Sequence, residues 1–285
     1  MQGTGYQERI RVCRRADLSA FAPWFVGDAA VGRVHRSRLA LLRELPAFAF
    51  ERGGFRLAGG DFASRSAAMA DAVGRLHRRG ELRAPLGEMY PVAATGAAEP
   101  LLQIDRAAVT WFGVPASGVH LNGFVVDRGL HLWIAVRASG KRTFPGHLDN
   151  VVAGGQSIGW SERSTLEKEC AEEAAIPPGL AASAQFVGTI RYEQQDGLSL
   201  KVDSLACYDL ALAPSFMPVP NDGEVDRFER LPLDAVAASL RGAGVWKPNS
   251  ALVTLHFLLR SGALDREVPA EERWRLWRHL HGELP

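Results

Sequence analysis

The sequence predicts an α+β fold in two parts, a small N-terminal unit over residues 1–117 and a larger unit over residues 118–285. The order of expected elements in the larger unit carries this prediction: strands come first, then one helix, more strands and finally helices. The chain has 285 residues, which suits one large domain or two ordinary ones. Hydrophobic residues make up 47% of it, enough for packed cores.

Composition also excludes several classes of protein. A net charge of +1 gives no electrostatic case for nucleic acid or a membrane surface. No apolar run approaches the length of a membrane span, and the first ten residues lack the apolar core of a signal peptide. Cys13, Cys170 and Cys207 are odd in number and widely spaced, which indicates reduced thiols. We therefore expect a cytoplasmic protein without nucleic-acid or membrane partners.

The N-terminal unit shows no catalytic signature. Its clearest element is a helix from Ser64 to Arg79, which opens with serine caps and ends before Gly80. Two short helices are expected at Asp17–Ala22 and Ser37–Leu45, with a loop at residues 31–33 between them. After Tyr90-Pro-Val, a loop of small residues at Ala93–Glu99 leads into Leu101–Ile104. Two roles stay open for the unit: packing and dimerisation, which would make the protein a homodimer, or a specificity wall over the active site.

The larger unit opens with strands Val119–Val126 and His131–Arg137, joined by Asp127-Arg-Gly129, whose residues suit a hairpin turn. Further strands are expected at Ala184–Tyr192, Leu198–Leu212 and Glu224–Leu231. Helices are expected from Pro232, over Asn249–Arg260 and over Ala270–His281.

A glycine loop and one helix lie at the centre of this unit. Gly154-Gly155 begins the loop, Ser161 or Ser164 can cap the helix, and Pro177 ends it. Glu169, Glu172 and Glu173 lie at i, i+3 and i+4, so their carboxylates share one helix face and repel one another. A divalent cation would reverse that repulsion, and Mg²⁺ (or Mn²⁺) prefers such ligands. A solvated acidic face is the alternative.

This stretch resembles the Nudix box, G-x5-E-x7-R-E-U-x-E-E-x-G-U, with U an aliphatic residue. Gly154 matches the opening glycine, the three glutamates match the last three of the motif, and Ile176 matches the final apolar position. Four positions depart from it: Trp160 replaces the first glutamate, Lys168 the arginine, Cys170 the aliphatic residue and Ala175 the last glycine. Glu162 lies two turns before Glu169 on the same face and is a candidate to substitute in part for the missing glutamate.

The resemblance extends over nearly the whole chain. Three further segments are similar to one Nudix subgroup that carries an extra N-terminal domain and occurs both alone and fused to thiamine pyrophosphokinase: residues 118–125, 141–155 and 246–253, together with Val26-Gly and Tyr90-Pro-Val. The resemblance implies a Nudix α/β/α sandwich preceded by a small α+β N-terminal domain. It also implies a diphosphatase that converts thiamine diphosphate, or its oxidised or damaged analogues, to the monophosphate.

The expected site follows from this chemistry, because attack on a diphosphate needs cations on its oxygens and a base for the water. The resemblance implies metal ligation by the Gly155 carbonyl together with Glu169, Glu172 and Glu173, and we expect Glu169 to be the base. Glu224 is the candidate for a further ligand, and the choice between Glu224 and Glu162 stays open, as does the number of metal ions. Lys141 and Arg142 are candidates for the phosphates, and Trp160, Trp111, Phe144 or Trp246 for stacking on the thiamine rings.

Two rival functions stay open. One is hydrolysis of another small-molecule diphosphate, such as a nucleoside diphosphate derivative, ADP-ribose or coenzyme A. The other is a Nudix-fold binding module without catalysis, favoured by the changes at positions 160 and 168 and opposed by the three glutamates.

Overall fold

The computed structural model describes residues 5–51, 54–94, 96–97, 99–242 and 245–282. The N-terminal part contains a four-stranded sheet of order β2-β1-β4-β3 and a separate hairpin, β5-β6. Its strands are β1 (Phe21–Val26), β2 (Ala29–His35), β3 (Phe48–Glu51), β4 (Gly54–Leu57), β5 (Met89–Val92) and β6 (Leu102–Asp105). Helix α3 (Phe62–Arg78) shares one hydrophobic core with both sheets. The predicted small α+β unit is therefore confirmed.

Several local predictions for this part are wrong. The expected helix over residues 17–22 is a 3-10 turn, η1 (Leu18–Ala20), that leads into β1, and the expected loop at 31–33 is the middle of β2. The reason is tertiary packing: Trp24 of β1 is buried and its indole N–H donates to the Phe112 carbonyl at 2.9 Å. Such a contact between distant residues leaves no local signal, and β3 and β4 were missed for the same reason.

The helices of this part agree better with prediction. Helix α3 begins after Asp61, which forms a capping box with Ser64. The expected helix at Ser37–Leu45 is present but shorter, as a 3-10 turn, η2 (Arg36–Arg38), followed by α2 (Leu39–Arg43). Residues 95 and 98 of the predicted small-residue loop lie outside the described residues.

A mixed seven-stranded sheet forms the centre of the larger part. Its main order is β11-β12-β7-β8-β13, with β10 paired to β7 and β9 paired to β8. The strands are β7 (Pro115–Val126), β8 (Leu130–Arg137), β9 (Leu148–Asn150), β10 (Val152–Gly155), β11 (Gln185–Asp196), β12 (Ser199–Ala211) and β13 (Val225–Pro232). The five predicted strands are confirmed, whereas the short strands β9 and β10 were missed.

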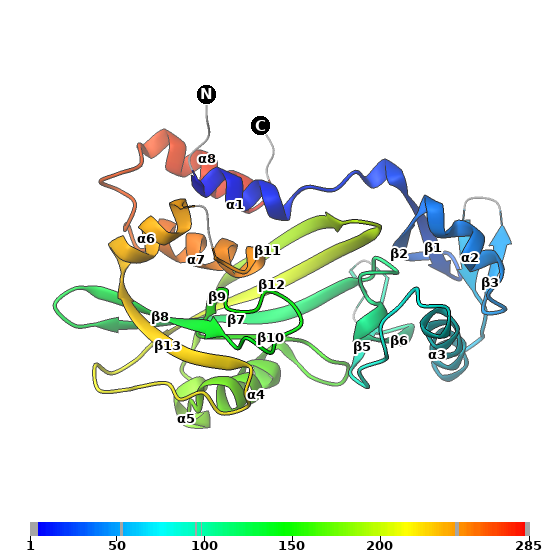
Figure 1. Cartoon of the computed structure of the whole chain (residues 1–285), viewed down its shortest axis with the longest axis horizontal. Helices are drawn as coiled ribbons and strands as arrows, with labels where there is room; N and C mark the ends of the chain where they lie inside the picture. The colour runs from blue at the N-terminus through cyan, green and yellow to red at the C-terminus, as the bar shows by residue number, and fades with distance from the viewer. Residues whose placement is uncertain (1–4, 52–53, 95, 98, 243–244, 283–285) are drawn as a thin grey trace.

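Helices cover both faces of this sheet, which gives the expected α/β/α sandwich (Figure 1). One face carries α4 (Glu162–Ala174) and α5 (Pro178–Ala181). The other carries α6 (Leu233–Arg241), α7 (Pro248–Arg260), α8 (Ala270–Leu280) and, unexpectedly, α1 (Gly5–Cys13). Tyr6 and Ile10 of α1 are buried against the C-terminal helices, so the start of the predicted N-terminal unit packs on the larger one. The boundary at 117/118 stays a prediction.

The three cysteines are buried free thiols, as predicted. None of the helices in the described part of the chain has both the length and the apolar character needed to cross a bilayer.

Candidate active site

The predicted glycine loop is held as a strand against β7. In β10, Gly154 pairs with Val119 and Gly155 pairs with Gly118. A side chain at Gly154 would place its Cβ 2.3 Å from both Cγ and Cδ of Glu169, a separation that real Cβ atoms do not show. Glycine is therefore required at position 154 for the Glu169 carboxylate to lie against the strand.

Gly155 is in similarly close contact with the N-terminal part. A Cβ at this position would lie 1.7 Å from the Tyr90 hydroxyl oxygen of β5. The carbonyl of Gly155 is an expected metal ligand. The sequence did not predict that Tyr90 would lie against this residue.

Helix α4 begins as predicted. The Ser161 hydroxyl accepts a hydrogen bond from the Ser164 N–H, and Ser164 in turn accepts from the Ser161 N–H, which completes a capping box. The apolar stripe of Leu166, Cys170 and Ala174 is fully buried against the sheet. This packing directs the glutamate face of the helix toward β10.

Two of the three box glutamates form ion pairs with the same lysine side chain. The Lys168 ammonium donates to Oε1 of Glu169 at 3.1 Å and to Oε2 of Glu172 at 2.6 Å. Lys168 therefore makes ion pairs at the position where the Nudix box has arginine. The Glu169 side chain is 15% exposed and that of Glu172 is 49% exposed, so the pair spans the edge of the site.

Glu173 points inward beneath the strand. Its Oε2 accepts a hydrogen bond from the Ala153 N–H at 2.8 Å, and the residue is 6% exposed. Burial raises the pKa of Glu173 well above its ordinary value, with Asp149 and Glu169 adding to the effect. Burial likewise raises the pKa of Glu169, assisted by Glu172 and Glu224 and opposed by Lys168. Both carboxyls thus lie where a bound cation would relieve an unfavourable charge.

Glu224 approaches the box, whereas Glu162 does not. Glu224 acts on the pKa of Glu169, as noted above, and forms an ion pair with Lys141. Burial acts to raise the pKa of Glu224, but Lys141 and Arg106 outweigh it and lower that pKa. Glu162 is exposed in the first turn of α4 and acts on Tyr208 instead. Of these two carboxylates, Glu224 is the one that influences Glu169, and it remains the candidate for the additional ligand.

The predicted substrate-binding residues are more dispersed. Lys141 is engaged by Glu224, Arg142 is exposed, and Trp160 is 45% exposed just before α4. Of the other aromatic candidates, Trp111 and Trp246 are each 2% exposed and belong to the cores, which removes them as stacking platforms. Phe144 is 38% exposed and keeps that possibility, together with Trp160.

The donor set suits a hard divalent cation. Carboxylate oxygens are the ligands that Mg²⁺ prefers, and those of Glu169 and Glu172 already converge on the Lys168 ammonium. Across the residues that the structure describes, no three His, Cys, Asp or Glu side chains lie close enough together to hold a metal ion. The pairing with Lys168 shows that the space between Glu169 and Glu172 already accommodates a positive charge.

A buried polar cluster behind Glu173 was missed by sequence reasoning. Asp149 accepts from Arg137 and Lys247, each at 2.9 Å, and from the Ser250 hydroxyl. Beside it, His120 and Asn150 are buried and joined at 2.8 Å through the imidazole Nδ1 and the amide oxygen. The three segments that carry the subgroup resemblance thus meet in one place, and their shared polar residues fix the strands behind the box.

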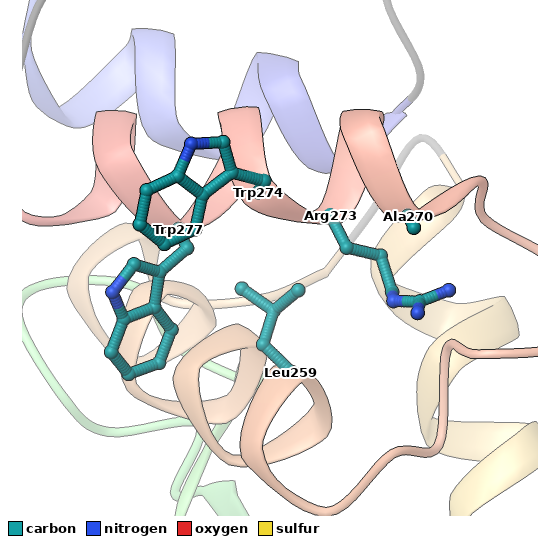
Figure 2. Close-up of a pocket in the computed structure, with 5 residues that line it drawn as sticks. All are labelled: Leu259, Ala270, Arg273, Trp274 and Trp277. Atoms are coloured by element: carbon teal, nitrogen blue, oxygen red, sulfur yellow. The ribbon is translucent and has the colours of Figure 1, made fainter.

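Two cavities in the described part of the chain lie away from the box. One, of about 250 Å³, lies between α7 and α8 and is lined by Leu259, Ala270, Arg273, Trp274 and Trp277 (Figure 2). Its charged residue, Arg273, already donates to the carbonyls of Val268 and Asp265. The other, of about 490 Å³, is lined by residues of β7, β11 and β12 and by Ser183. Neither is lined by a box residue.

Comparison with known proteins identifies the family. Residues 5–116 match a family described as "Domain of unknown function (DUF4743)". Nudix hydrolase 20, chloroplastic, of Arabidopsis thaliana is 36% identical over 93% of this chain and 75% of its own length. Nudix hydrolase 24, chloroplastic, of the same plant is 35% identical with the same coverage. Among solved structures, the Deinococcus radiodurans protein DR0079 is 24% identical over 54% of this chain and 91% of its own, with a TM-score of 0.44. The chain belongs to the Nudix hydrolase family of enzymes.

Proposed function

We propose that this protein is a Mg²⁺-dependent Nudix hydrolase that cleaves thiamine diphosphate, or its oxidised or damaged analogues, to the monophosphate and phosphate. The hydrolase activity in this proposal is supported by one observation: the carboxylates of Glu169 and Glu172 converge on the Lys168 ammonium beside the glycine strand. The thiamine part is supported by the resemblance of residues 118–125, 141–155 and 246–253 to the thiamine-related subgroup.

The residues divide into three roles under this proposal. Glu169, Glu172, Glu173 and the Gly155 carbonyl would hold Mg²⁺ (or Mn²⁺), with Glu224 as the further ligand. When bound, the metal supplies positive charge to the phosphate oxygens and makes the attacking water more acidic. Glu169 is the proposed base, and its carboxylate lies against Gly154 of the glycine strand. Lys141, Arg142 and Trp160 are the proposed contacts to phosphates and rings.

Phosphate release from a panel of substrates tests the substrate class. The panel contains thiamine diphosphate, oxythiamine diphosphate, ADP-ribose, coenzyme A and nucleoside triphosphates, each with Mg²⁺. Preferential cleavage of the thiamine compounds supports the proposal. Cleavage of the others alone keeps the enzyme class and rejects thiamine, and binding without any turnover favours a binding module.

Location and assembly are also part of the proposal. The three buried free thiols suit a reducing compartment, and we propose the cytoplasm, although the Arabidopsis relatives are named as chloroplastic. Fractionation of cells that express the tagged protein would test this. A homodimer is proposed from the packing role considered for the N-terminal part, and light scattering would measure it.

A further inference from the structure

The N-terminal part meets the larger part at the glycine loop of the candidate site. The β5-β6 hairpin lies between α3 and the start of β7 (Figure 1). The Ile158 N–H donates to the Met89 carbonyl at 2.8 Å, and the Ser157 hydroxyl donates to Oε1 of Glu88 at 2.9 Å. The loop that follows the predicted metal-binding glycine is therefore held by two hydrogen bonds from the N-terminal part.

Glu88 also holds a cation at this contact. Its other oxygen, Oε2, accepts from Nη1 of Arg106 at 2.7 Å, and the Arg106 N–H donates to the Glu88 carbonyl at 2.9 Å. One carboxylate thus links Arg106 to Ser157 of the loop. This arrangement fixes the base of the guanidinium beside the glycine strand.

The rest of the Arg106 guanidinium is available. The side chain is 52% exposed, and within the described ranges no partner is found for its Nε or Nη2. Through Glu88 the guanidinium is joined to Ser157, which lies two residues after Gly155. A guanidinium with free donors therefore lies beside the loop that follows the glycine strand.

Tyr90 provides a second donor from the same hairpin. The residue is 5% exposed, its hydroxyl lies against Gly155, and no hydrogen-bond partner for that hydroxyl occurs among the residues the structure describes. Its hydroxyl is therefore an unused donor beside the glycine strand, and an oxygen of a ligand bound there would accept a hydrogen bond from it.

We propose that Arg106 and Tyr90 of the N-terminal part complete the active site by donating hydrogen bonds to phosphate oxygens of the diphosphate substrate. Glu88 is the positioning residue that directs Arg106. The planar fork of arginine matches phosphate oxygens, and the tyrosine hydroxyl adds a neutral donor beside the glycine strand. This inference rests on the proposed function for its substrate class, and it gives the N-terminal part a direct role in binding.

The test compares Arg106→Gln, Arg106→Lys and Tyr90→Phe with wild type and with a matched control. Arg75→Gln is that control, because Arg75 of α3 is also partly exposed and pairs with a carboxylate, Asp71, at 2.7 Å, away from the box. The measurements are KM and kcat with Mg²⁺, the Kd for inorganic pyrophosphate by calorimetry, and the unfolding temperature of each variant.

We expect Arg106→Gln to raise KM and the pyrophosphate Kd by about tenfold to a hundredfold, as for a lost charge-assisted hydrogen bond. Arg106→Lys should recover part of the loss, since it restores the charge without the fork. Tyr90→Phe should raise both constants by about threefold to tenfold, and Arg75→Gln should change neither.

Wild-type constants in the folded Arg106→Gln and Tyr90→Phe proteins would overturn the inference. If Arg106→Gln does not fold, Arg106→Lys and Tyr90→Phe decide on the same criteria. If wild type cleaves none of the diphosphates, the proposed function fails, and pyrophosphate binding still decides this inference. Weaker binding by the variants would support it, whereas equal binding, or no binding by wild type, would overturn it.

Discussion

Helix α4 ends at a position where this chain departs from the Nudix box. Ala175 replaces the last glycine of the motif and adopts φ 51° and ψ 33°, the left-handed conformation. Its N–H nevertheless closes the helix by donating to the Cys170 carbonyl. The chain therefore keeps the backbone that glycine favours while carrying a Cβ that opposes it.

Ala175→Gly should stabilise the protein. A Cβ in the left-handed region costs about 1–2 kcal/mol, while glycine costs about 0.4–1 kcal/mol through the entropy of the unfolded chain. The difference favours glycine by roughly 0.8 kcal/mol. In a chain of this size the unfolding temperature should rise by about 2–4 °C for each kcal/mol.

Urea unfolding followed by fluorescence measures this change, with Ala174→Gly as the matched control. Ala174 is fully buried and is the last residue of α4, so the same substitution there should lower the midpoint. A midpoint for Ala175→Gly that equals wild type or falls below it would refute the reasoning.

Three further perturbations test the site and its support. Asp149→Asn should lower the free energy of unfolding by about 3–5 kcal/mol, because the cationic side chains of Arg137 and Lys247 lose their counter-charge. The attraction of those cations outweighs burial and lowers the pKa of Asp149 to about 2, so the stability that this carboxylate contributes is lost as pH falls from about 4 to about 2. Urea titrations at several pH values should show that loss in wild type and not in Asp149→Asn. Metal-free wild type should lose stability as pH rises through the raised pKa of Glu173, because the buried carboxyl then becomes charged. Glu173→Gln has no such group, so its unfolding temperature, measured by thermal melts across pH, should not show this loss. Gly154→Ala should displace Glu169 and lower kcat at least tenfold, whereas Gly140→Ala, which has open space for a Cβ, should leave kcat unchanged; equal kcat in both would contradict the packing argument.

The parts of the fold that the sequence predicted are those with a local physical signal. Helix α4 has its serine caps, its apolar stripe and a proline after it, and all three lie within the segment itself. The hairpin between β7 and β8 has its turn residues. By contrast, β1 depends on Trp24 reaching Phe112, and α1 belongs to the core of the larger part through Tyr6, contacts that join residues far apart in the chain.

The site follows the same rule. The spacing of the box glutamates predicts a shared helix face, and Glu169 and Glu172 do meet on Lys168, whereas Glu173 lies beneath the strand and accepts from the Ala153 N–H. Arg106 and Tyr90 carry no comparable pattern, since their approach to the glycine strand depends on how the β5-β6 hairpin docks on the larger part. Asp149 and Lys247 are 98 positions apart and form a buried ion pair that no local spacing indicates.

The central claim is that the α4 carboxylates bind the cation needed for hydrolysis of a diphosphate. The most direct measurement is phosphate release by wild type and by Glu172→Gln, each with and without Mg²⁺. Glu172 is half-exposed, so the substitution should leave the fold intact. The account predicts Mg²⁺-dependent release by wild type and a rate lower by orders of magnitude in the variant. Near-wild-type release by Glu172→Gln would contradict it.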